Sequence, residues 1–131
     1  MKTDKKLVLI VDDDEDILFQ MKLNLAETEY EIMTAGSEKE ARKILEDTRP
    51  DLVILDLMME NRDSGFVLSH SIKRLDPMIK VILVTAVTSE TGMEFDASTP
   101  DERRWVKADT IMSKPVRKDQ LLREIDSLMG A

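Results

Sequence analysis

Five short apolar runs, each of strand length, constrain the fold of this chain more than any other feature. They occupy residues 7–11, 30–34, 52–55, 81–84 and 110–112. The stretches between them carry apolar residues at helical spacing. Such alternation is typical of a parallel sheet covered on both faces by helices. We therefore predict an α/β fold, a doubly wound five-stranded parallel sheet, and we expect about five helices.

The helical stretches carry start signals and apolar faces. Residues 14–16 are all acidic, which suits the positive end of a helix dipole. Ser37 and Glu40 form a capping box, in which each side chain can satisfy an unpaired amide. The expected buried positions of these two helices are Ile17, Leu18, Met21, Leu25, Ala41, Ile44, Leu45 and Thr48.

The second half of the chain is less regular. A third helix is predicted from about Gly65 to Leu75, and a last one has an apolar stripe at Leu121, Leu122, Ile125, Leu128 and Met129. Residues 88–107 form a polar stretch in which we predict only a short helix over residues 100–107. No linker or repeat divides the sequence, so we expect one domain over residues 1–131.

Composition excludes several classes of function. The chain has 27 acidic and 19 basic residues and a net charge of −8, which disfavours binding to nucleic acid or to an anionic membrane. It has no cysteine, so thiolate metal sites and cysteine nucleophiles are excluded. The early apolar run at residues 7–11 is too short for a signal peptide or a membrane span. We expect a cytoplasmic protein.

Chemically useful residues follow four of the five predicted strands. Asp12 and Asp13 follow the first, Asp56 the third, Thr85 the fourth and Lys114 the fifth. Because the carboxyl ends of parallel strands form one rim, where ligands bind, we expect these side chains to lie together.

Clustered carboxylates of this kind need a cation. Two carboxylates about 4 Å apart repel by about 4 kcal/mol at an effective dielectric of 20. Oxygen ligands favour Mg²⁺ over zinc, which prefers His and Cys. Lys114 supplies a second positive charge.

Four segments of the sequence resemble the receiver domain of two-component response regulators. They are Val-Asp12-Asp13-Asp, Leu-Asp56-Leu-Met-Met, Thr85-Ala86 and Lys114-Pro115, in that order. The resemblance extends from about Lys6 to Met129 and implies the flavodoxin-like receiver fold. Four such segments at compatible spacings make the resemblance specific, although each one alone is weak.

The resemblance implies a role for each matching residue. Asp56 would be the phosphoacceptor, and Asp12 and Asp13 would hold Mg²⁺ together with Asp56 and the backbone carbonyl of Met58. Thr85 and Lys114 would contact the phosphoryl group, and the peptide bond before Pro115 would be cis. The domain would not be an enzyme in the usual sense, since it would catalyse only its own phosphorylation and slow dephosphorylation.

The implied partners are proteins. A sensor histidine kinase or a histidine phosphotransfer protein would donate the phosphoryl group, and a downstream protein target would respond to it. The family also relates hydrolysis of the acyl phosphate to the side chains at the positions of Met58 and Val87. Neither can orient a water molecule, so we predict slow dephosphorylation.

Three positions depart from the family pattern. The usual proline four residues after the phosphoacceptor is Glu60, and the loop to Gly65 is one residue longer than usual. The aromatic switch residue three before the lysine is Ile111. The polar stretch 88–107 makes the segment between Thr85 and Lys114 several residues longer than is typical, and we expect a remodelled fourth-helix surface there.

Other functions fit less well. A phosphohydrolase of the haloacid dehalogenase type would need Thr or Val where Asp16 stands, and an EF-hand would need Gly at Ile17 and Glu at Leu23. A pseudo-receiver, which has the fold without the phosphorylation, would have no reason to keep the clustered carboxylates. Lone receivers, phosphorelay intermediates and pieces of longer regulators remain open alternatives.

Overall fold

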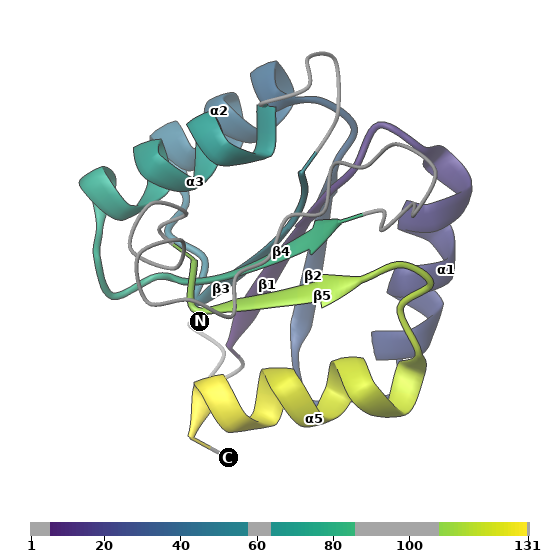
Figure 1. Ribbon diagram of the computed structural model, residues 1–131. Coiled ribbons are helices and arrows are strands. Elements are labelled where there is room, and N and C mark those ends of the chain that lie inside the picture. The colour runs from purple at the N-terminus through teal and green to yellow at the C-terminus, as the bar shows by residue number, and fades with distance from the viewer. Residues whose placement is uncertain (1–5, 58–63, 86–107, 131) are drawn as a thin grey trace.

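The computed structural model describes residues 6–57, 64–85 and 108–130 of the chain, and it contains a five-stranded parallel sheet (Figure 1). The strands are β1 (Leu7–Val11), β2 (Glu31–Ala35), β3 (Leu52–Asp56), β4 (Lys80–Thr85) and β5 (Thr110–Ser113). Their order in the sheet is β2-β1-β3-β4-β5, and every neighbouring pair is parallel. The predicted fold class is confirmed.

Four helices in the described residues cover the two faces of this sheet (Figure 1). They are α1 (Glu15–Leu25), α2 (Glu38–Asp47), α3 (Ser64–Leu75) and α5 (Lys118–Met129). Helices α2 and α3 lie on one face, and α1 and α5 lie on the other. The short helix predicted over residues 100–107 falls outside the described residues.

Alternation along the strands divides the core into two layers. Successive strand side chains point to opposite faces, so Leu9 and Val11 pack toward α2 and α3 whereas Val8 and Ile10 pack toward α1 and α5. All four are almost completely buried. Burying each such side chain contributes about 1.5–3 kcal/mol to stability. The central strands are therefore stable, and they fix the positions of the residues at their carboxyl ends.

The starts of α1 and α2 follow their prediction. Asp14 is the N-cap of α1, where its carboxylate accepts hydrogen bonds from the amides of Asp16 and Ile17. The Ser37 hydroxyl accepts from the Glu40 amide at 3.0 Å, as the capping box predicts. The returning contact is also present, because the Glu40 carboxylate accepts from the amide of Gly36 at 3.2 Å.

The buried helix faces follow their prediction with one exception. Met21 and Leu25 of α1 and Leu121 and Ile125 of α5 are buried, and their predicted neighbours pack partly against the core. Thr48 was predicted on the buried face of α2, but it is the C-cap of that helix in extended conformation, because α2 ends at Asp47. None of the helices in the described ranges has the length and apolar character needed to cross a membrane.

Candidate functional site

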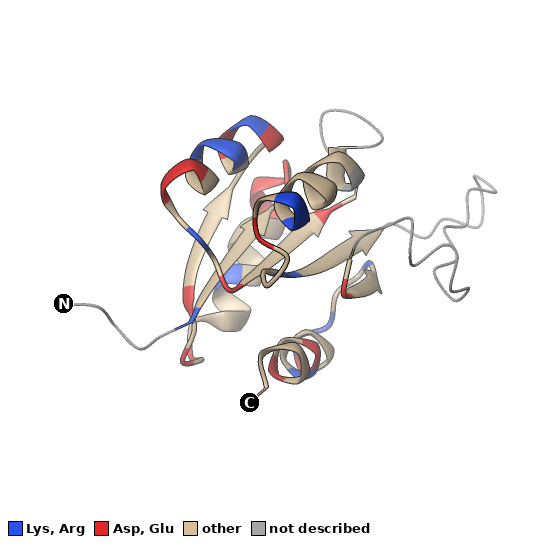
Figure 2. Cartoon of the chain, turned by 90° about the vertical axis from the view of Figure 1, so that its left-hand side faces the viewer, with Lys and Arg blue, Asp and Glu red and all other residues tan. Residues whose placement is uncertain are grey.

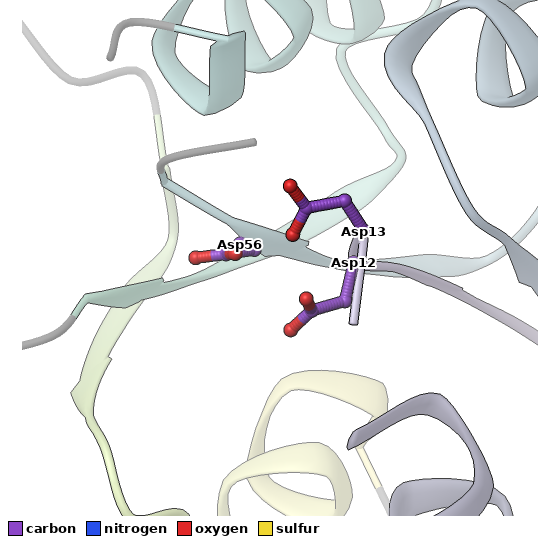
Figure 3. Close-up of side chains that lie close together, drawn as sticks. All are labelled: Asp12, Asp13 and Asp56. Atoms are coloured by element: carbon purple, nitrogen blue, oxygen red, sulfur yellow. The ribbon is translucent and has the colours of Figure 1, made fainter. Parts of the chain in front are cut away.

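An acidic cluster lies where the winding direction of the sheet reverses. The chain passes from β1 to β2 on one side and then to β3 on the other, which is the place where such sheets bind ligands. The register pairs Val11 with Leu55, so the next residues, Asp12 and Asp56, lie at the same level at the carboxyl ends of β1 and β3. Figure 3 shows the side chains of Asp12, Asp13 and Asp56 converging there.

The three carboxylates are close enough to share one cation. A carboxylate oxygen from each of Asp12, Asp13 and Asp56 lies within 4.8 Å of the others. Asp12 is 2% exposed and Asp56 is 7% exposed, whereas Asp13 is exposed to solvent. The site therefore has a buried floor of two carboxylates and an open side at Asp13.

Burial has an electrostatic consequence for Asp12. It raises the pKa of the Asp12 carboxyl above its ordinary value, and the carboxylates of Asp13 and Asp14 act in the same direction. The hydrogen bond from the Asp14 amide, 2.9 Å long, and the ammonium of Lys114 lower the pKa and partly oppose this effect. A cation bound among the carboxylates would favour the charged form.

Lys114 reaches the cluster from the end of β5. Its ammonium nitrogen lies 3.6 Å from Asp12 Oδ2 and 3.5 Å from Asp56 Oδ1, so one cation faces both buried carboxylates. The Lys114 amide donates to the carbonyl of Thr85 at 2.8 Å, which fixes the backbone of Lys114 beside the end of β4. The Lys114–Pro115 peptide bond is cis.

Thr85 ends β4, which neighbours β3 on the side opposite β1. The register pairs Asp56 with Val84, so Thr85 is the next residue toward the rim. Thr85 is buried, with 5% of its surface exposed. The structure thus brings the carboxylates of Asp12, Asp13 and Asp56 and the ammonium of Lys114 together. It places Thr85 at the same rim of the sheet.

Gly65 is a residue of the site that sequence reasoning did not identify. Its amide donates to the carbonyl of Leu57 at 2.9 Å, which joins the first turn of α3 to the end of β3. A Cβ at this position would lie 2.5 Å from the Cα of Leu57 and 2.6 Å from the carbonyl oxygen of Asp56. Only glycine lets α3 approach the backbone of Asp56 so closely. The signal in the sequence was a glycine at a predicted helix start, interpreted there only as part of a loop.

Other predicted residues are placed as follows. Ile111 is partly buried and packs against the core layer under α2 and α3. His70 is exposed on α3. Met58, Glu60 and Val87 lie outside the described residues.

The donor set fits a hard divalent cation. All three side chains offer oxygen atoms, and the described residues contain no cysteine or histidine near them. Magnesium is held in proteins by one or two carboxylates, backbone oxygens and waters, which matches a cluster with one solvent-exposed side. Zinc would call for nitrogen or sulfur ligands.

Comparison with known proteins identifies the family. The model of the response regulator receiver domain matches residues 8–126. This chain therefore belongs to the response regulator receiver domains of two-component systems, and its cluster of Asp12, Asp13 and Asp56 could hold a metal ion.

Individual relatives agree with this assignment. The chain is 33% identical over 110 residues to the alkaline phosphatase synthesis transcriptional regulatory protein PhoP of Bacillus subtilis; the match covers 84% of this chain and 42% of PhoP. The chain therefore matches less than half of that relative's length. A CheY-like receiver domain protein from Methanospirillum hungatei is 26% identical, with a TM-score of 0.79, and covers 97% of this chain and 96% of its own. The response regulator TrrA of Thermotoga maritima, solved in complex with Mg(2+)-BeF, is 29% identical with a TM-score of 0.74, covering 94% and 98% of the two chains.

Proposed function

We propose that this chain is a phosphoacceptor domain that takes a phosphoryl group onto Asp56 from a sensor histidine kinase or a histidine phosphotransfer protein. The observation that carries the proposal is the position of the Lys114 ammonium, 3.5 Å from Asp56 and 3.6 Å from Asp12, beside three carboxylates within 4.8 Å. A bound Mg²⁺ and the ammonium of Lys114 would together neutralise a site that accepts further negative charge.

Asp56 would act as the nucleophile. A carboxylate oxygen attacks phosphorus in line, a P–O bond forms, the P–N bond to the donor histidine breaks, and the electron pair leaves with the imidazole. Asp56 is buried at the end of β3, and Gly65 lies so close to its backbone carbonyl that this backbone has little room to move, which would fix the direction of attack. Positioning of this kind lowers the entropic cost of the reaction.

The second requirement is to neutralise the negative charge on the oxygens of the transferring phosphoryl group. Asp12, Asp13, Asp56 and the Met58 carbonyl would hold Mg²⁺, which supplies positive charge to the phosphoryl oxygens when bound. TrrA, which was solved with Mg(2+)-BeF, supports that choice of metal. Lys114 would stabilise a phosphoryl oxygen through its ammonium, and Thr85 would donate its hydroxyl to the same group.

Phosphorylation would then act as a switch. A Thr85 hydroxyl drawn toward the phosphoryl group would shift the end of β4 and, through the Thr85–Lys114 backbone hydrogen bond, the end of β5. Ile111 lies on β5 and packs into the core, so here an aliphatic side chain would respond in place of an aromatic one. The output would be altered binding of a downstream protein by a single domain over residues 1–131, in the cytoplasm, without direct contact with nucleic acid or membrane.

The experiment is intact-mass spectrometry after incubation with Mg²⁺ and acetyl phosphate. We expect the gain of one phosphoryl group, which Asp56→Asn should lose and the exposed-residue control Asp47→Asn should keep. A folded protein that gains no phosphoryl group at saturating Mg²⁺ would refute the proposal and favour a pseudo-receiver. The same assay measures the lifetime of the phosphoryl group, and a lifetime of only seconds would contradict the predicted slow dephosphorylation.

A further inference from the structure

A pocket lies at the other end of α3 from the acidic cluster. Its volume is about 440 Å³, and its lining residues are His70, Lys73, Arg74, Pro77, Ala108 and Asp109. Arg74 follows Gly65 by nine residues on α3, which is roughly 14 Å along the helix axis at about 1.5 Å per residue. The pocket is therefore separate from the site at Asp56.

Positive charge is concentrated on the helical wall of this pocket. Lys73 and Arg74 are the Lys and Arg residues of α3, and both belong to its last turn. His70 precedes them by three and four residues, so the three side chains lie on one face of the helix. The last turn of α3 is blue in Figure 2, whereas the rest of the described helix carries no Lys or Arg.

Lys73 and Asp109 form a fixed wall. The Lys73 ammonium lies 2.7 Å from Asp109 Oδ2 and donates to the carbonyl of Ile79 at 2.6 Å. The same carboxylate oxygen accepts from the amide of Val81 at 2.8 Å. The Asp109 charge is thus already satisfied by Lys73 and a backbone amide, so it does little to repel an anion in the pocket.

Arg74 supplies the charge that remains. It is exposed, and its guanidinium makes no ion pair with any other residue in the described part of the chain. Lys and Arg in the last turn of a helix also interact favourably with the helix dipole. That role alone would not require a pocket between the end of α3 and the start of β5. A guanidinium presents a planar fork of donors that matches phosphate and carboxylate groups.

We propose that this pocket binds a small anionic ligand whose phosphate or carboxylate group is held by Arg74 with His70 beside it. The volume falls within the range of about 300–1,000 Å³ that is usual for small-molecule sites. The pocket has room for a ligand larger than a single phosphate ion.

The experiment is a titration of the whole chain with pyrophosphate and, separately, with citrate, followed through backbone amide shifts by NMR. Divalent metal is removed beforehand, so that the carboxylates of the Asp56 site repel both anions. We expect saturable shifts at residues 70–79 and 108–109. Arg74→Gln should weaken binding about tenfold or more, since it removes a charge-assisted contact, and Arg123→Gln, an exposed arginine on α5, should leave binding unchanged.

The two probes separate the two chemistries. Saturable binding of pyrophosphate alone would assign the pocket to phosphorylated ligands, and binding of citrate alone would assign it to carboxylates; either supports the proposal. Neither probe saturating, or equal loss of affinity in Arg74→Gln and Arg123→Gln, would overturn it. Shifts confined to the residues around Asp12 and Asp56 would overturn it as well.

Discussion

Replacing Gly65 by alanine tests how the fold fixes the phosphoacceptor. The added Cβ would lie 2.5 Å from the Cα of Leu57 and 2.6 Å from the carbonyl oxygen of Asp56, where 3.4–4 Å is ordinary contact. Both neighbours are backbone atoms, so neither can rotate away. Helix α3 must therefore move by about 1 Å relative to the end of β3, or the backbone of Asp56 must shift.

The expected cost combines two opposing effects. Overpacking of a closely packed site costs about 1–3 kcal/mol, whereas alanine in a helix is favoured over glycine by about 1 kcal/mol. We therefore expect Gly65→Ala to lower the free energy of unfolding by about 1–2 kcal/mol. A displacement near 1 Å at a reacting group can also cost up to about a hundredfold in rate, so phosphorylation should slow by about tenfold or more.

Urea unfolding and the rate of phosphorylation by acetyl phosphate measure the two effects. Gly36→Ala is the matched control, because its Cβ would meet nothing closer than the flexible Glu40 carboxylate at 3.6 Å. It should be neutral or stabilise by up to about 1 kcal/mol through the unfolded state. The reasoning would be refuted if Gly65→Ala matched the control in stability and the wild type in rate.

Three further predictions concern the metal, the lysine and a remote tyrosine. Mg²⁺ at ten times its dissociation constant should raise the free energy of unfolding by about 1.4 kcal/mol. Asp13→Asn should remove most of this gain in thermal unfolding, and an equal gain in both proteins would contradict the proposed ligand set. Lys114→Met should slow phosphorylation by about tenfold or more, because it removes the ammonium 3.5 Å from Asp56, while the exposed control Lys118→Met should not; equal rates would argue against the role of Lys114. Burial, together with the 2.7 Å hydrogen bond to Asp126, raises the pKa of Tyr30 from 10.0 to about 12. The stability linked to this shift is complete below pH 10.0 and is lost as the pH rises toward about 12, so Tyr30→Phe should show a smaller fall in urea stability over that range than the wild type.

The sequence was sufficient to predict the fold because local pattern and global topology agree. The strands carry apolar runs on both faces, as buried parallel strands require, and each begins and ends within one residue of its prediction. The position of the acidic cluster followed from the same logic. Asp12 directly follows β1 and Asp56 ends the neighbouring strand β3 at the same level of the sheet, so their convergence depends only on topology and register.

Contacts set by tertiary packing could not be predicted from the sequence. The closeness of Gly65 to Leu57 depends on how near α3 approaches the end of β3. The ion pair of Lys73 with Asp109 joins residues 36 positions apart and needs both the end of α3 and the register of β5. The pocket beside that pair is likewise a product of packing.

The most direct test of the central claim is to locate the phosphoryl group chemically. Borohydride reduces an aspartyl phosphate to homoserine, which peptide mass spectrometry can assign to one position after incubation with acetyl phosphate and Mg²⁺. We expect homoserine at position 56 and at no other aspartate, because the buried Asp56 carboxylate lies beside Lys114. Homoserine at position 12 or 13 with none at 56, from a folded protein, would contradict it.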